Sequence, residues 1–113
     1  MIYETEFELK KKNNSIEIKN AIIEKIECKE KITITISETP DISDNMFTQN
    51  VIRLTIEKII KELFGLFGIV NQEKIEDFKN IPCKIVFDGD KLIAIGNSKI
   101  FLTIEKITEL SKK

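Results

Sequence analysis

The fold prediction starts from residues 47–68, which read FTQNVIRLTIEKIIKELFGLFG. At the spacing of an α-helix, Arg53, Glu57 and Lys61 recur at every fourth position on one side, and the apolar residues form a stripe on the other. The stripe consists of Ile52, Ile56, Ile59, Ile60, Leu63 and Phe67. No other part of the chain keeps helical periodicity for so long. The pattern therefore predicts one long amphipathic helix that covers a sheet built by the rest of the chain.

The composition is that of one small domain spanning residues 1–113. Of the 113 residues, 42% are hydrophobic, which is enough to bury one core without metals or disulfides. The net charge is only −1, which argues against a partner held mainly through a nucleic-acid backbone. The N-terminus lacks the basic start and apolar block of a secretory signal, and no apolar run reaches the ~18–20 residues that span a bilayer. We therefore expect a cytoplasmic protein.

The residue types that most often carry catalysis are scarce. The chain has no histidine, which removes histidine-based acid–base relays and argues against a transition-metal site. Its two cysteines, Cys28 and Cys83, each lie in an apolar run, and no CxxC motif is present. We interpret both as reduced, buried side chains rather than as a disulfide or a redox pair. No cofactor and no metal are expected.

The first third of the chain reads as a set of strands. Residues 3–10 alternate apolar and charged side chains, which predicts a half-buried strand. The alternation resumes at residues 16–18 and its phase slips at residues 19–21, where a tight turn or a bulge would explain the slip and we favour the turn. Residues 32–37, ITITIS, are the clearest strand. These segments predict an antiparallel meander of three or four strands.

Helix boundaries can be placed from the capping residues. Asp44 or Asn45 is suited to cap the start of the 47–68 helix, and Gly65 and Gly68 are suited to the positive φ angle that ends it. Asn71 can cap a short second helix, which Pro82 would not allow to continue.

The last third of the chain predicts a hairpin and a terminal helix. Residues 83–87 and 91–96 read as two strands joined by a turn at Asp88-Gly89-Asp90. Residues 100–110 read as a short strand that passes into a helix. The predicted fold class is therefore α+β: an antiparallel β-meander of three or four strands packed on one long amphipathic helix, followed by a β-hairpin and a short C-terminal helix.

Several segments resemble, in order, those of a group of small uncharacterised bacteriophage and prophage proteins. These segments are IKNAIIEKI (18–26), FGIV (67–70), EDFKNIPCKIVF (76–87) and AIGN (94–97). In that group a strand hairpin, a glycine-rich loop and one helix lead to a closing hairpin of the form W-E-x-L-x-G-x-x-V-R-V…AIGH. The present chain lacks the tryptophan, has Asn80 where a glycine is common, and has Lys84 in place of the arginine. The resemblance implies a phage or prophage origin, and therefore the cytoplasm of the host cell.

The candidate binding residues surround the only arginine of the chain. The planar guanidinium of Arg53 can bind a phosphate or carboxylate through two hydrogen bonds, which lysine does poorly. Phe47, Gln49, Asn50 and Asn97 are the residues that we expect to join it in a pocket for a nucleotide-like ligand. The alternative is that Arg53 is simply exposed, that Phe47 belongs to the core and that the amides are solvated.

Two other motifs have simpler explanations. Asp41, Asp44, Asp88 and Asp90 offer carboxylates for a small hydrolase or a cation site, but turn chemistry accounts for Asp88-Gly89-Asp90. The Gly65-x-x-Gly68 spacing follows a predicted helix and lacks the Gly-Lys-Ser/Thr of a phosphate loop, so it indicates helix termination.

These observations favour a non-enzymatic binding protein over a hydrolase or a structural or nucleic-acid-associated phage protein. We expect a phage accessory protein that acts stoichiometrically on a host component. Its predicted partner is a host defence protein or a small anionic, nucleotide-like ligand, and its role would be counter-defence. A homo-oligomer is possible, with the binding surface at the sheet–helix seam or at a dimer interface.

Overall fold

A computed structural model describes residues 2–39, 51–69 and 72–113, and within the last range the side chains from residue 75 onward. Its main feature is a seven-stranded, wholly antiparallel sheet in the order β1-β7-β6-β5-β2-β3-β4. The elements follow one another as β1 (Glu4–Thr5), α1 (Glu6–Lys12), β2 (Ile16–Cys28), β3 (Ile32–Glu38), β4 (Val51–Ile56), α2 (Lys61–Leu66), the 3₁₀ helix η1 (Gln72–Asp77), β5 (Ile81–Asp88), β6 (Lys91–Gly96), β7 (Ile100–Thr103) and α3 (Ile104–Ser111). None of the described helices is long and apolar enough to cross a membrane.

The predicted fold class is wrong, because the stretch expected to be one long helix is mostly strand and loop. Residues 51–56 form β4, which pairs residue by residue with β3, and only Lys61–Leu66 are helical. Within 51–56 the residues Ile52, Leu54 and Ile56 alternate with exposed Arg53 and other exposed side chains. This period of two, together with β-branched residues, suits a strand once β3 offers a partner. The predicted caps at Asp44 and Asn45 lie outside the described residues.

The predicted strand at residues 3–10 is also wrong, because all but its start is helix α1. Thr5 caps this helix: the backbone N–H of Glu8 donates to its hydroxyl oxygen at 3.2 Å, and the hydroxyl donates to the Glu8 carboxylate at 3.1 Å. A Thr followed three residues later by Glu is a sequence signature of a helix start, and here it outweighs the alternation of apolar and charged residues. One residue of α1, Leu9, is buried.

The predicted turn at residues 19–21 is wrong as well, because β2 runs without a break through its 13 residues. The alternative, a bulge at residues 19–21, is absent too, because β2 pairs with β5 in unbroken register from Ile16 to Ile23. The apolar phase changes there because Ile16 and Ile18 pack on one face of the sheet, with Val86, whereas Ala21 and Ile23 belong to the main core on the other face. A bulge does occur further along, at Glu24 in the pairing of β2 with β3. Before the bulge Ile23 faces the core, and after it Ile26 does, although the two are three residues apart. A bulge of one extra residue allows this change of phase within one strand.

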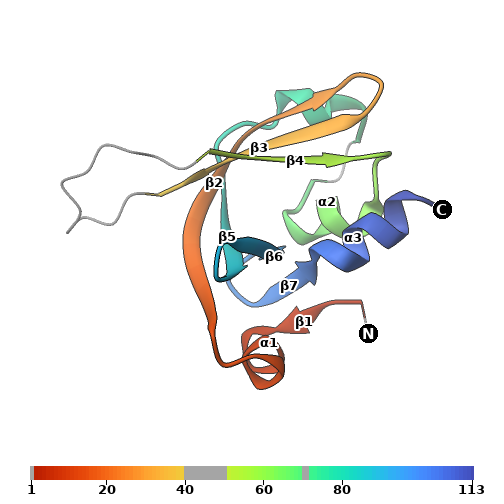
Figure 1. Ribbon diagram of the computed structural model, residues 1–113. Coiled ribbons are helices and arrows are strands. Elements are labelled where there is room, and N and C mark those ends of the chain that lie inside the picture. The colour runs from red at the N-terminus through yellow and green to blue at the C-terminus, as the bar shows by residue number, and fades with distance from the viewer. Residues whose placement is uncertain (1, 40–50, 70–71) are drawn as a thin grey trace.

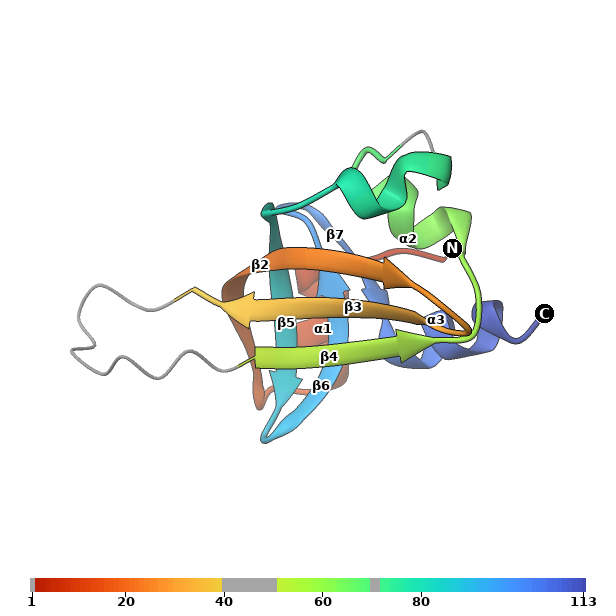
Figure 2. The same cartoon turned by 90° about the horizontal axis from the view of Figure 1, so that it is seen from above.

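The sheet folds into two layers that share β2. The first part of this strand, Ile16–Ile23, pairs with β5, and the last part, Ala21–Cys28, pairs with β3. In Figure 1, β2 curves from the lower layer to the upper one. Figure 2 shows that the strands β2–β3–β4 lie across those of β5, β6 and β7. The arrangement is an orthogonal packing of two sheets in which one bent strand forms the corner.

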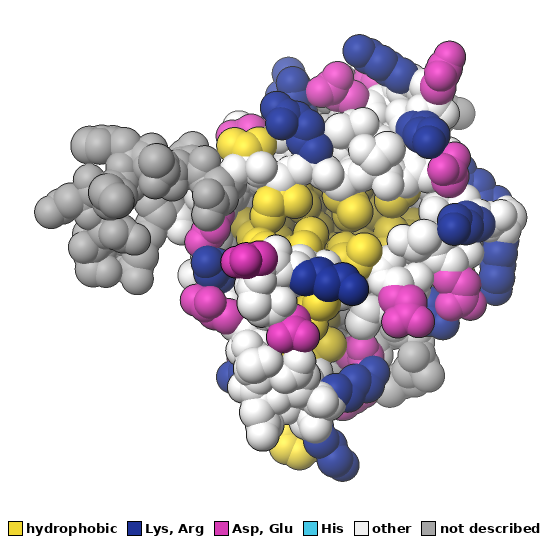
Figure 3. All heavy atoms as spheres, in the orientation of Figure 1, with side chains coloured by type: hydrophobic (Ala, Val, Ile, Leu, Met, Phe, Trp, Pro, Cys, Tyr) yellow, Lys and Arg dark blue, Asp and Glu magenta, His cyan; other side chains and the backbone are white. Residues whose placement is uncertain are grey.

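The core fills the space between the layers and is closed by helices. Buried side chains of both layers pack with those of α2 and α3, among them Leu63, Phe64 and Ile107, which are 0%, 1% and 0% exposed. A smaller cluster on the far side of the lower layer joins Leu9 of α1 to Val86, Ala94 and Phe101. On the face shown in Figure 3, apolar side chains remain visible in a hollow between the layers.

Several local predictions are confirmed. The strand at residues 32–37 lies within β3, residues 83–87 and 91–96 form the β5–β6 hairpin, and residues 100–110 form β7 followed by α3. Gly68 has the predicted positive φ, +73°, and directly follows Phe67, the C-cap residue of α2. The backbone N–H of Ile69 donates to the Phe64 carbonyl at 2.9 Å, which completes a Schellman motif. Gly65, by contrast, lies inside α2.

Candidate functional site

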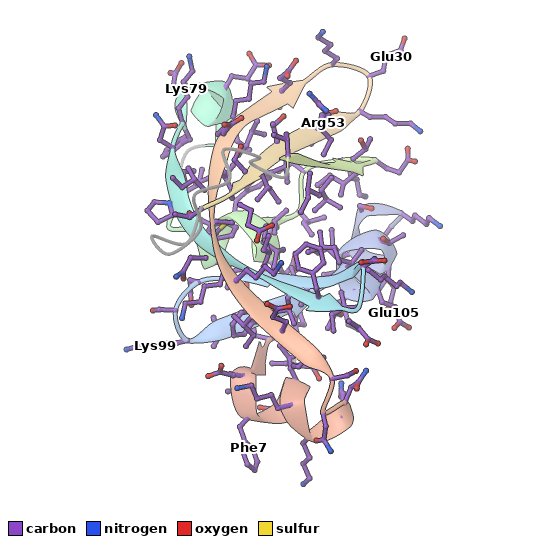
Figure 4. The ribbon with its side chains drawn as sticks, turned by 60° about the vertical axis from the view of Figure 1, so that its left-hand side comes forward. Phe7, Glu30, Arg53, Lys79, Lys99 and Glu105 are labelled. Atoms are coloured by element: carbon purple, nitrogen blue, oxygen red, sulfur yellow. The ribbon has the colours of Figure 1, made fainter. Side chains whose placement is uncertain are left out.

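Arg53 lies on the outer face of the upper layer, on the strand at the edge of the sheet. Its neighbours in β4 that face the core, Ile52 and Leu54, are half-buried, whereas Arg53 is exposed. Figure 4 shows its side chain projecting from β4. Among the residues that the structure describes, none forms an ion pair or a hydrogen bond with its guanidinium. Arg53, Glu57 and Lys61 do not share one helix face, because Arg53 lies in β4 and Lys61 begins α2, and Glu57 contacts Lys31 at 3.5 Å.

The other predicted pocket residues do not gather around Arg53 within the described structure. Phe47, Gln49 and Asn50 lie outside the described residues. Asn97 lies in the turn between β6 and β7, in the lower layer, and Figure 4 shows Lys99 of the same turn far from Arg53. The Asn97 side chain donates to the Leu66 carbonyl at 3.0 Å and accepts from the backbone N–H groups of Lys99 and Ile100 at 2.8 and 3.0 Å. It therefore holds this turn against α2.

Strand pairing gives Arg53 a different set of neighbours. Across the three strands of the upper layer, Lys25 pairs with Thr35 and Thr35 pairs with Arg53, so the three side chains form one row on the outer face. Side chains directly opposite each other in neighbouring strands have Cβ atoms only ~4.5–5.5 Å apart. The Thr35 side chain therefore lies between the side chains of Lys25 and Arg53 in this row.

The next row of the same face adds a second hydroxyl and an apolar flank. Ser37 lies between Ile22 and Val51, of which Ile22 is half-buried and Val51 is 45% exposed. Exposed valine and isoleucine side chains beside a row of cations provide a surface for a planar apolar group next to a charged one. We call the rows Lys25–Thr35–Arg53 and Ile22–Ser37–Val51 the outer-face site.

The two hydroxyls of the outer-face site are buried without a partner. Thr35 is 3% exposed and Ser37 is 5% exposed, and neither hydroxyl forms a hydrogen bond with any residue that the structure describes. A buried polar group left in this state costs about 1–3 kcal/mol. An acceptor atom that reached either hydroxyl, once the flexible stems of Lys25 and Arg53 had moved aside, would recover part of that cost.

The charges around the site leave Arg53 as its uncompensated cation. Lys25 contacts Glu27 at 3.2 Å on the same strand, and Glu27 also lies 3.9 Å from Lys29. Glu24, at the bulge, is half-buried. An incoming anion would therefore have to compete with Glu27 for Lys25, but no carboxylate among the described residues competes for Arg53.

The remaining reactive side chains of the described structure are engaged or protonated. Asp88 accepts from the Asn13 amide at 2.8 Å and from the Ser15 hydroxyl at 3.0 Å, which ties the hairpin to the end of α1. Asp41 and Asp44 lie outside the described residues. Burial raises the pKa of the Cys83 thiol to about 12, and burial together with Glu76 raises the pKa of Cys28. Both cysteines are free, and neither thiol is present as a thiolate nucleophile near neutral pH.

In the described part of the chain, no three His, Cys, Asp or Glu side chains lie close enough together to hold a metal ion. Comparison with protein families, with curated proteins and with solved structures finds no match, so nothing in these comparisons links the chain to a phage family.

Sequence reasoning found Arg53 and missed Lys25, Thr35 and Ser37. One signal was available, because residues 32–37 place hydroxyl side chains at every second position, opposite the isoleucines. A strand with isoleucine on one side and Thr33, Thr35 and Ser37 on the other predicts a hydroxyl-lined outer face.

Proposed function

We propose that this protein is a non-enzymatic binding protein that holds a small anionic, nucleotide-like ligand at the outer-face site. The observation that carries the proposal is the row Lys25–Thr35–Arg53, in which the side chains of two cations flank a buried hydroxyl that has no hydrogen-bond partner among the described residues. The guanidinium supplies two parallel donors for a phosphate, and the hydroxyl supplies a third. Ile22 and Val51 supply apolar surface for a base.

The residue types that most often carry catalysis are scarce or unreactive here, which supports binding without turnover. The chain has no histidine, and the two thiols have raised pKa values. The Asp88 carboxylate, which a hydrolase would need free, is held by Asn13 and Ser15. No described observation favours the hydrolase.

The resemblance to phage and prophage proteins gives this binding a biological role. A stoichiometric binder of a nucleotide-like signal would act as a sponge that lowers the free concentration of a host defence messenger. This role rests on the resemblance, whereas the ligand class rests on the outer-face site.

Calorimetric titration with AMP, cyclic AMP and inorganic phosphate tests the ligand class. We expect saturable binding of at least one nucleotide by the wild-type protein, and recovery of that nucleotide unchanged. Replacing Arg53 by Gln removes charge-assisted hydrogen bonds worth about 1.5–3 kcal/mol, so affinity should fall by about 10- to 150-fold. Because Arg53 is exposed and does not contribute to the core, the melting temperature should stay nearly constant.

Two matched variants sharpen the test. Arg53→Lys keeps the charge but not the planar fork, so it should recover only part of the affinity. Lys99→Gln removes an exposed cation from the turn of the lower layer and should bind like the wild type. Wild-type affinity in Arg53→Gln would remove Arg53 from the site, and conversion of any added nucleotide to a product would overturn the non-enzymatic assignment.

A further inference from the structure

Strand β4 has one edge without a partner strand among the described residues. It is the last strand of the sheet order and pairs only with β3. The edge therefore presents backbone N–H and C=O groups that another strand can use. Figure 2 shows β4 along the rim of the upper layer, and in Figure 1 α3 lies below the C-terminal half of β4, on the inner side of this layer.

This edge lacks three features that prevent strands from pairing: a proline, a bulge and an inward-pointing charge. Its six residues, VIRLTI, contain no proline, and their register with β3 is regular throughout. Every position that faces the core, Ile52, Leu54 and Ile56, is apolar, so no inward-pointing charge blocks a neighbour. Protected edges commonly carry a bulge, a proline or an inward charge.

The surface beside the edge is apolar as well. Ile52 and Leu54 are only half-buried, as are Phe87 and Leu92 of the β5–β6 hairpin in the other layer. These residues belong to the two layers that border the hollow in Figure 3. An added strand would extend the upper layer and cover part of this surface.

We propose that the partner of this edge is a second copy of the chain, paired through β4 in an antiparallel two-fold arrangement centred on Thr55. In this register Arg53 lies opposite Glu57 of the second copy, the first residue after the end of β4, and symmetry forms the same ion pair twice. Leu54 lies opposite Ile56 on the inner face, and Thr55 opposite Thr55 on the outer face. Opposite charges, apolar pairs and Thr–Thr pairs are the favourable cross-strand combinations.

Charge selects this register from its neighbours. A two-fold antiparallel pair centred on any residue of β4 sets core-facing positions opposite core-facing positions, so the faces alone do not select the register. Centring the pair on Leu54 would set Arg53 opposite Thr55 and form no ion pair. Centring the pair on Arg53 would set two guanidinium groups opposite each other, which is destabilising. Glu57 is exposed and contacts Lys31 at 3.5 Å, so its carboxylate can also receive the arginine of the second copy.

The dimer goes beyond the proposed function, because it requires no ligand. It uses the same guanidinium, however, so an anionic ligand and the second copy compete for Arg53. A nucleotide that binds at the outer-face site should therefore shift the protein toward the monomer.

Sedimentation equilibrium of a charge-reversal series tests the dimer. We expect a concentration-dependent dimer for the wild type. Arg53→Glu and Glu57→Arg should each weaken it by about tenfold or more, because each places two pairs of like charges in the interface. The double variant Arg53→Glu/Glu57→Arg restores the opposite charges and should return the dissociation constant to within about threefold of the wild type. Lys99→Glu, an exposed reversal in the lower layer, is the control.

Each outcome decides the proposal. A wild type that stays monomeric at the highest soluble concentration would overturn the proposal. A double variant that dimerises no more tightly than the single variants, while circular dichroism shows that all variants are folded, would overturn it too. Glu57→Arg keeps the guanidinium of Arg53, so nucleotide titration of this variant separates the two proposals. Lost dimerisation with intact nucleotide binding supports both, and a wild-type dimer without nucleotide binding refutes only the proposed function.

Discussion

Gly96 is the glycine at which the structure leaves no room for a side chain. A Cβ atom added there would lie 2.4 Å from the carbonyl oxygen of Ile100, 2.4 Å from Cδ1 of the Phe101 ring and 2.8 Å from its Cγ. The ring is 1% exposed, and the Ile100 carbonyl accepts a hydrogen bond from the backbone N–H of Asn97 at 3.0 Å. Neither neighbour can move aside without breaking packing or a hydrogen bond.

Replacing Gly96 by Ala should therefore be costly. Overpacking of a core typically costs 1–3 kcal/mol, and two fixed neighbours place this site at the upper end, at about 3 kcal/mol. For a chain of this size, each kcal/mol corresponds to about 4 °C, so the melting temperature should fall by about 12 °C. Loss of that much is a large part of the roughly 5–15 kcal/mol that holds a domain folded.

Gly65→Ala is the matched control, since it makes the same chemical change with the opposite expected sign. Gly65 is exposed inside α2, and a Cβ there would meet only the Tyr3 hydroxyl at 4.0 Å. Alanine is favoured over glycine within a helix by about 0.5–1 kcal/mol, so this variant should melt slightly higher than the wild type. Thermal and urea unfolding followed by circular dichroism measure both. A Gly96→Ala variant within about 0.5 kcal/mol of the wild type would refute the packing of β6 against β7.

Two further predictions concern a helix cap and a buried thiol. Thr5→Ala should lower the free energy of unfolding by about 1 kcal/mol, because the backbone N–H of Glu8 loses its acceptor. The control variant Thr108→Ala, at an exposed helical position, should have little effect. Equal losses of stability in the two variants would contradict the cap. In the folded protein the pKa of the Cys83 thiol is about 12, whereas in the unfolded chain the thiol ionises near 9.0. The free energy of unfolding should therefore fall as the pH rises above 9, by up to about 1.4 kcal/mol per pH unit. Urea titrations at several pH values should show a smaller slope for Cys83→Ala, and an unchanged slope would exclude this cause.

Residues 47–68 misled the fold prediction because their apolar residues satisfy two periods. Ile52 and Ile56 belong both to a helical stripe and to the alternation of residues 52, 54 and 56. The choice between the two is made by β3, which lies earlier in the chain and pairs with β4 over six residues. A pattern within one segment cannot contain that non-local pairing. The segments that were predicted correctly, such as the β5–β6 hairpin, are held by a neighbour two residues away.

The candidate site was predictable in part for the same reason. Arg53 could be identified because its chemistry does not depend on the element that carries it. Lys25 and Thr35 could not be joined to it, since their proximity follows from the register of β2 with β3 and of β3 with β4. Once Arg53 is assigned to a helix, those two pairings do not exist. Predicting the row requires the strand order together with both registers, including the bulge at Glu24.

The bulge at Glu24 connects the fold to the site. Before it, the odd-numbered residues Ala21 and Ile23 face the core, and without an extra residue Lys25 would follow them inward. The bulge instead turns Ile26 inward and places Lys25 on the outer face, opposite Thr35. The bulge is therefore the feature that brings a cation to the outer-face site. Deleting Glu24 would remove the extra residue, so Lys25 would follow Ile23 in regular alternation and stay opposite Thr35. The upper layer and the row should therefore persist in this variant, with a smaller bend in β2.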